Sequence, residues 1–164
     1  MRQETSTFKR RLDIEVIITP KCQPMSHIGP IIIVEDDTDD QEIISHVLNQ
    51  LNIPNEVVFF DSCQDAYNYL KTTTNKPFII LSDINLPGLN GLELKRQIDS
   101  DPELRQKSIP FIFMSTAAEK SVVNEAYTKM AVHGFFQKTS TLEQIREVLS
   151  CIINYWKLSK HPAG

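Results

Sequence analysis

Five short apolar runs constrain the fold of this chain more than any other feature of its sequence. Each run has the length of a β-strand and is followed by a segment with helical spacing, which is the pattern of successive βα units in a parallel sheet. The runs IIIV at 31–34 and FIIL at 78–81 are apolar on consecutive residues, as expected for strands that helices cover on both faces. The predicted strands are 30–34, 56–60, 78–82, 110–114 and 133–137. We therefore predict an α/β fold with a doubly wound parallel sheet.

The starts of the intervening helices are marked by residues that can cap a helix. Each candidate is followed three positions later by a side chain that can complete a capping box. The pairs are Thr38 with Gln41, Ser62 with Asp65, Asn90 with Glu93, Thr116 with Glu119, and Ser140 with Glu143. The last helix also carries an apolar stripe at 142, 145, 149, 152 and 156, which predicts that it packs on the sheet.

The length of 164 residues allows one domain, which we expect at 30–156, with short appendages. Pro20 and Pro24 interrupt residues 1–29, which lie outside the five βα units, so we expect a flexible N-terminal extension there. A sixth strand at 13–19 is the less favoured alternative. Residues 157–164 form a predicted C-terminal tail that is too short for an output domain.

Charge and cysteine content exclude several classes of function. The 17 basic and 21 acidic residues give a net charge of −4, which argues against a nucleic-acid-binding surface. Cys22, Cys63 and Cys151 are far apart and lack metal-ligand spacing, so we interpret them as reduced thiols. No apolar stretch approaches the roughly 20 residues that cross a bilayer, and the chain does not start with a signal peptide. We expect a cytoplasmic protein without a membrane partner.

Acidic residues follow two of the predicted strands. Glu35 and Asp36 come directly after the first strand, and Asp83 comes directly after the third. Because the carboxyl ends of parallel strands lie along one edge of the sheet, these side chains are expected to converge. Clustered carboxylates repel one another unless a cation lies between them, which favours a site for Mg²⁺. Asp39 and Asp40 are instead interpreted as first-turn acids that stabilise a helix dipole.

Two further residues at this edge suit phosphate oxygens. Thr116 ends the fourth strand and offers a hydroxyl donor, although capping a helix is its alternative role. Lys138 ends the fifth strand and offers an ammonium group, although a solvated loop lysine is the ordinary interpretation. The acids expected opposite Lys138 favour the phosphate-binding role for this residue.

Together these residues resemble the receiver domain of two-component response regulators, over residues 30–156. The resemblance rests on the acidic pair after the first strand, on Asp-x-x-x-Pro-Gly-x-x-Gly beginning at Asp83, on Thr116, and on Lys138. It implies a flavodoxin-like (βα)5 sheet with strand order 2-1-3-4-5. It also implies a stand-alone, single-domain response regulator that acts in a phosphorelay.

The resemblance assigns a role to each site residue. Asp83 would accept a phosphoryl group from a sensor histidine kinase or a histidine phosphotransfer protein. Asp36, Asp83 and the backbone carbonyl of Asn85 would hold Mg²⁺, with Glu35 assisting through water. Lys138, together with Thr116, would bind the phosphoryl oxygens. Such a protein catalyses only its own phosphorylation and dephosphorylation, and is not otherwise an enzyme.

The resemblance also implies a switch and an output surface. Phosphorylation would draw Thr116 inward and let Phe135 follow, which reshapes the surface of the fourth helix, fifth strand and fifth helix. That surface is expected to bind a downstream protein or a second copy of the chain. Two residues depart from the family pattern: Thr139 replaces the usual proline after Lys138, and Phe135 lacks the hydroxyl of a tyrosine switch.

Three other interpretations stay open. A phosphatase of the haloacid dehalogenase type also uses a strand-end aspartate with Mg²⁺, but that family has Asp-x-Asp after its first strand where this chain has Glu-Asp-Asp. A receiver-like scaffold that binds partners without phosphorylation is disfavoured because all the key side chains are present. A phosphohistidine protein using His46 is the third, although an ordinary histidine on a helix surface is the simpler interpretation.

Overall fold

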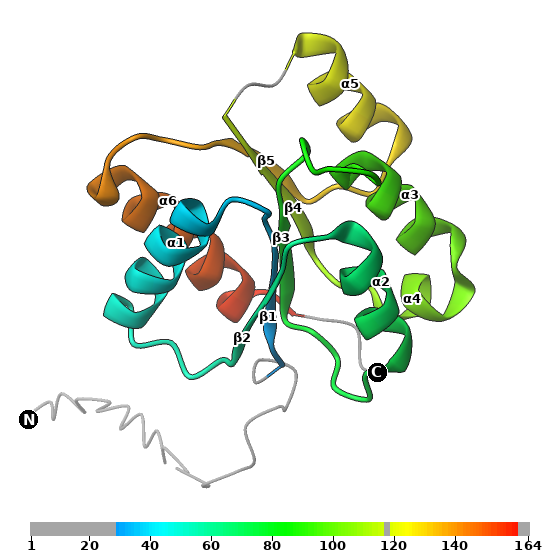
Figure 1. The fold of residues 1–164 in the computed structure, drawn as a ribbon. Helices are drawn as coiled ribbons and strands as arrows, with labels where there is room; N and C mark the ends of the chain where they lie inside the picture. Colours follow the sequence, from blue (N-terminus) through cyan, green and yellow to red (C-terminus); the bar gives the residue numbers. More distant parts are fainter. Residues whose placement is uncertain (1–28, 117–118, 161–164) are drawn as a thin grey trace, which may run out of the picture.

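The computed structural model describes residues 29–116 and 119–160. In this part of the chain, parallel strands form one five-stranded sheet in the order β2-β1-β3-β4-β5 (Figure 1). The strands are β1 (Ile31–Val34), β2 (Val57–Phe60), β3 (Ile79–Ser82), β4 (Phe111–Ser115) and β5 (Gly134–Gln137). Each lies within one residue of its predicted bounds, and the doubly wound, flavodoxin-like fold is confirmed.

Helices cover both faces of the sheet (Figure 1). They are α1 (Thr38–Gln50), α2 (Cys63–Thr72), α3 (Gly91–Ser100), α4 (Pro102–Lys107), α5 (Lys120–Lys129) and α6 (Leu142–Leu158). α1 and α6 pack on one face, where their buried residues form an apolar cluster with alternate strand residues. The helices α2, α3, α4 and α5 contribute to a second apolar cluster on the other face. The core therefore has two layers that the sheet separates.

The central strands are apolar on consecutive residues because they serve both layers. In β1, Ile31 and Ile33 face α1 and α6, whereas Ile32 and Val34 face the opposite layer. All four of these side chains are buried. Burying one such side chain stabilises the folded state by roughly 1.5 to 3 kcal/mol, so these strands are strongly held in register.

Two of the predicted helix caps are confirmed. Asn90 and Glu93 form a complete capping box at the start of α3, with hydrogen bonds of 2.9 Å in both directions. Ser62 caps α2 by accepting a hydrogen bond from the backbone N–H of Asp65. These caps fix the residues at which α2 and α3 begin, at the carboxyl edge of the sheet.

The other predicted caps are displaced along the chain. The N-cap of α1 is Asp37 and not Thr38, because the Asp37 carboxylate accepts from two backbone N–H groups and favours the positive end of the helix dipole. Thr141, one residue after Ser140, caps α6. α5 begins at Lys120 with Glu119 at its N-cap, so Thr116 does not cap that helix.

The short helix α4 was not predicted. Asp101 caps it by accepting from the N–H groups of Glu103 and Leu104, and Pro102 occupies its first turn. Six residues are too few to show a helical period, so only this Asp-Pro start marks the helix in the sequence. The side chain of Lys107 binds α4 to the end of α2 by donating to the carbonyl of Leu70, at 3.0 Å.

Parts of the predicted organisation lie outside the described residues. Residues 1–28, which contain most of the predicted extension and the alternative strand at 13–19, belong to this group, as do residues 161–164. α6 continues to Leu158, two residues beyond the predicted domain end. Among the described helices, none combines the length and the apolar character that spanning a bilayer requires.

Candidate functional site

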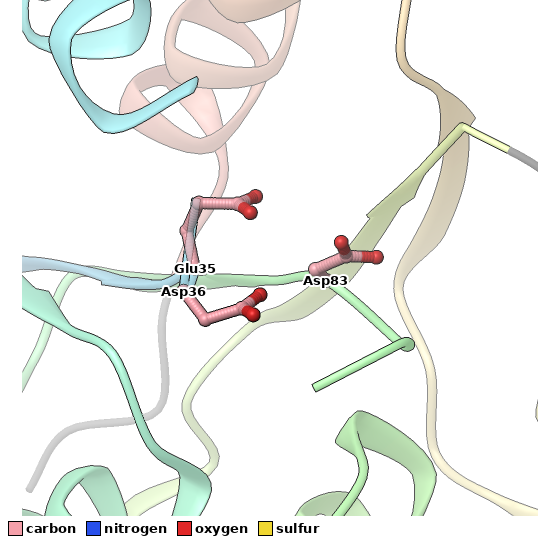
Figure 2. A group of neighbouring side chains, drawn as sticks. All are labelled: Glu35, Asp36 and Asp83. Atoms are coloured by element: carbon pink, nitrogen blue, oxygen red, sulfur yellow. The ribbon is translucent and has the colours of Figure 1, made fainter. Parts of the chain in front are cut away.

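The acidic residues converge at the carboxyl edge of the sheet, as predicted. β1 and β3 are neighbours in register, with Val34 opposite Ser82, so the residues that follow them lie side by side. The backbone N–H of Asp83 donates to the carbonyl of Val34 at 2.9 Å. Glu35, Asp36 and Asp83 each offer a carboxylate oxygen, and these oxygens all lie within 4.8 Å of one another (Figure 2).

Lys138 lies among these acids. Its ammonium group donates to the carboxylates of Glu35, of Asp40 at 2.7 Å, and of Asp83 at 3.1 Å. The backbone N–H of Lys138 donates to the carbonyl of Ser115, so the pairing of β5 with β4 extends to this residue. The side chain of Lys138 is only 11% exposed, which makes a solvated loop lysine the wrong interpretation.

Burial and charge shift the pKa values of two of these groups. Burial raises the pKa of Glu35 above its ordinary value, and Asp83 adds to the rise, while the hydrogen bond and charge of Lys138 oppose it. Burial alone would lower the pKa of Lys138, but its hydrogen bonds to Asp40 and Glu35 and the charge of Asp83 raise it overall. Lys138 is therefore firmly protonated, and it holds this group of carboxylates together.

The donor set suits a hard divalent cation. Glu35 and Asp83 are buried and Asp36 is exposed. A bound ion would therefore have buried carboxylates on its inner side and would be accessible to water on its outer side. Counting Asp40, one ammonium group faces several carboxylates, which leaves an excess of negative charge. Carboxylate oxygens with room for water are the ligands that Mg²⁺ prefers. The residues present therefore fit such an ion.

The loop from β3 to α3 fixes the Asp83 side chain. Its Oδ1 accepts from the backbone N–H of Ile84 at 2.6 Å and of Asn85 at 3.3 Å, while Oδ2 faces Lys138. Gly91 starts α3 directly against this loop, and a Cβ at Gly91 would lie 2.2 Å from the carbonyl oxygen of Asp83. Gly88 has a φ of +76°, a conformation that side chains disfavour. Asn85, whose carbonyl the resemblance assigns to the metal, is an exposed residue of the same loop.

Two hydroxyls follow one another at the end of β4. Thr116 lies just beyond the strand and is exposed, whereas Ser115 is the last strand residue and is fully buried. Ser115 is in register with Gln137, the residue before Lys138. Sequence reasoning named only Thr116. Its neighbour could have been found from strand alternation, because Phe111, Phe113 and Ser115 share one face of β4.

Three other residues for which the sequence made a prediction, Phe135, Thr139 and Asp40, lie in the neighbourhood of Lys138. Phe135 is half-buried in β5, and its ring centroid lies 5.9 Å from that of Phe113 in the layer beneath α3 and α5. Every peptide bond in the described residues is trans, including the one between Lys138 and Thr139. Asp40 was interpreted as a helix-dipole acid, but its contact with Lys138 joins residues 98 positions apart, which no local pattern reveals.

Comparison with known proteins agrees with this geometry. The family model of the response regulator receiver domain matches residues 31–150. Response regulator Rcp1 of Synechocystis sp. is 26% identical over 131 residues, which cover 77% of this chain and 87% of Rcp1. The crystal structure of the phosphorylated cyanobacterial phytochrome response regulator RcpA matches with a TM-score of 0.73 and 28% identity, covering 82% of this chain and 99% of RcpA.

The Mn²⁺-bound form of Rcp1 matches with a TM-score of 0.71 and 25% identity, over 82% of this chain and 99% of Rcp1. Each match spans nearly the whole of the solved structure and most of this chain. This chain therefore belongs to the family of response regulator receiver domains.

Proposed function

We propose that this chain accepts a phosphoryl group on Asp83 in a two-component phosphorelay, with Mg²⁺ bound beside it. The observation that carries the proposal is the convergence of Glu35, Asp36 and Asp83 within 4.8 Å, with Lys138 in contact with Asp83. The phosphorylated form of RcpA and the Mn²⁺-bound form of Rcp1 support the two parts of the proposal. The donor is a sensor histidine kinase or a histidine phosphotransfer protein.

Asp36, Asp83 and the backbone carbonyl of Asn85 are the proposed ligands of Mg²⁺, and Glu35 assists through water. The bound ion supplies charge neutralisation for the phosphoryl oxygens. Asp83 is already oriented by the N–H group of Ile84, which leaves its other oxygen, Oδ2, on the Lys138 side. A carboxylate held in this way needs little reorganisation before it attacks phosphorus.

The chemistry is an in-line displacement. A carboxylate oxygen of Asp83 forms a bond to phosphorus as the bond from phosphorus to the donor's histidine nitrogen breaks. Lys138 neutralises charge on the transferring group, and a hydroxyl at the end of β4 donates to a phosphoryl oxygen. We propose Ser115 for this donor role beside Thr116, because Ser115 is buried next to the site. The chain then catalyses only its own phosphorylation and dephosphorylation.

Phosphorylation adds roughly −1.5 to −2 charges at pH 7 to a site that is already rich in acids. Lys138 would follow the phosphoryl oxygens, and the end of β4 would move inward with Phe135 behind it. The proposed output surface consists of α5, β5 and α6, which are the fourth helix, fifth strand and fifth helix of the sequence prediction. This surface binds a downstream protein or a second copy of the chain. Tyr127 on α5 and Tyr155 on α6 are exposed there, at 53% and 63%.

Intact-protein mass spectrometry after treatment with acetyl phosphate tests the proposal. We expect a gain of one phosphoryl group that requires Mg²⁺, disappears in Asp83→Asn, and persists in the matched control Asp39→Asn. Asp39 is an exposed acid of the same helix turn as Asp40. A gain that survives in Asp83→Asn would refute the acceptor assignment. Absence of any gain, with acetyl phosphate and with a panel of histidine kinases, would favour a phosphorylation-independent scaffold.

A further inference from the structure

A basic cleft lies at the amino edge of the sheet, at the opposite end from Asp83. Its volume is about 470 Å³. The polar residues that line it come from three separate places: α3, the segment from α4 to β4, and the segment from α5 to β5. They are Lys95, Asp99, Arg105, Ser108, Lys129 and His133, and these residues define the basic cleft.

The floor of the basic cleft contains a buried ammonium group. Lys95 is only 3% exposed, and its Nζ lies 2.6 Å from Oδ1 of Asp99. The same Nζ lies 5.5 Å from the centre of the Phe111 ring, in a cation–π arrangement. Removing an ammonium group from water is costly, so a lysine in this position needs compensating negative charge. Asp99 is the carboxylate that lines the cleft beside it.

The positive charge of the basic cleft exceeds that of its single acid. Lys95, Arg105 and Lys129 line the cleft together with Asp99, which leaves a formal excess of two positive charges. This excess occurs in a chain with a net charge of −4, so it is a local feature of the cleft and not of the molecule as a whole. A guanidinium group and an ammonium group opening into one cavity are the usual partners of oxyanions.

His133 adds a neutral hydrogen-bond donor to the same cavity. Its Nδ1 accepts from the backbone N–H of Phe111 at 3.1 Å, so in the neutral ring the proton lies on Nε2. Burial and the nearby charge of Lys95 lower the pKa of His133, which favours the neutral ring. The ring packs edge-on against Trp156 of α6, at 5.3 Å between centres, and is thereby held in place.

We propose that the basic cleft binds a small oxyanion with two negative charges, either a phosphate group or a dicarboxylate. Arg105 and Lys129 supply the exposed positive charges, and the buried ammonium group of Lys95 adds a positive electrostatic potential at the floor of the cleft. The cavity volume lies in the range of about 300 to 1,000 Å³ that is typical of small-molecule sites. One doubly charged oxyanion of this kind would neutralise the excess of two positive charges without displacing the Lys95–Asp99 pair.

Titration of the full chain with inorganic phosphate, and separately with succinate, tests the proposal at pH 7.5 in buffer without divalent cations. Backbone amide chemical shifts report where each anion binds. We expect saturable shifts at Ser108, Ala131 and His133, and none that are centred on Asp83. Binding of phosphate alone would identify a phosphate ligand, and binding of succinate alone a dicarboxylate; either outcome supports the proposal.

Two charge-matched double variants separate a built site from general attraction. Arg105→Gln with Lys129→Gln should weaken binding about tenfold or more, because it removes two charge-assisted contacts. Lys120→Gln with Lys157→Gln changes the net charge equally outside the cleft and should leave the affinity unchanged. The proposal is overturned by equal weakening in both double variants, by shifts centred on Asp83, or by the absence of binding to either anion.

Discussion

Replacing Gly91 by alanine should disturb the loop from β3 to α3, which holds Asp83. A Cβ at this position would lie 2.2 Å from the carbonyl oxygen of Asp83, and ordinary contact begins at 3.4 Å. The backbone of Asp83 or the start of α3 must therefore move by about 1.2 Å. Overpacking of this kind costs roughly 1 to 3 kcal/mol. Because an error of about 1 Å at a reacting group can slow a reaction roughly 100-fold, we expect a comparable loss of phosphorylation rate.

Gly88→Ala is the matched control, since it adds the same methyl group to the same loop. Nothing lies within 4 Å of a Cβ at Gly88, so only its φ of +76° opposes the change. That backbone conformation costs an alanine roughly 1 to 2 kcal/mol and leaves Asp83 in place. Urea unfolding, followed by Trp156 fluorescence, measures stability, and mass spectrometry after acetyl phosphate measures the rate. Equal phosphorylation rates in wild type and Gly91→Ala would refute the close-approach argument.

Three further predictions concern charge. Lys138→Met should raise the pKa of Glu35 further, because Lys138 opposes the effect of burial; an unchanged Glu35 titration by NMR would contradict the contact between Lys138 and Glu35. Mg²⁺ at 100 times its dissociation constant should stabilise the wild type by about 2.7 kcal/mol, and less at the same concentration in Asp36→Asn, as thermal melts can measure. The folded state disfavours the protonated form of His133, whose pKa lies below the ordinary value of 6.5. The stability that the neutral ring contributes is therefore fully present above pH 6.5 and is lost as the pH falls below 6.5. His133→Gln should weaken the pH dependence of the free energy of unfolding. Equal slopes of this free energy against pH in wild type and variant would refute the prediction.

The central strands β1, β3 and β4 were predictable because both of their faces are buried, which requires apolar residues at consecutive positions. The convergence of Glu35, Asp36 and Asp83 followed from the same pattern, since parallel strands end along one edge. Both inferences needed only local composition and a rule about topology. The family resemblance then proposed a role for each of these residues, which the phosphorylation experiments test.

Features that depend on single-residue placement were not predictable in this way. The predicted fourth strand ended at residue 114, one position too early for strand alternation to include Ser115, so Thr116 was named and Ser115 was missed. The contact of Asp40 with Lys138 joins the first helix to the end of the last strand, and only the folded chain reveals it. α4 was missed because its six residues carry a start signal without a period.

The position of β5 in the sheet determines how much energy is needed to displace it. Among the described strands, β5 pairs with β4 alone and so lies at the edge of the sheet. Moving an interior strand strains two hydrogen-bonded ladders, whereas moving an edge strand strains one. Lys138 and Phe135 both belong to this edge region. In the proposed function Lys138 contacts the phosphoryl group, so the strand that would respond to phosphorylation is the one that its neighbours restrain least, and a small displacement there would meet less resistance than in the central strands.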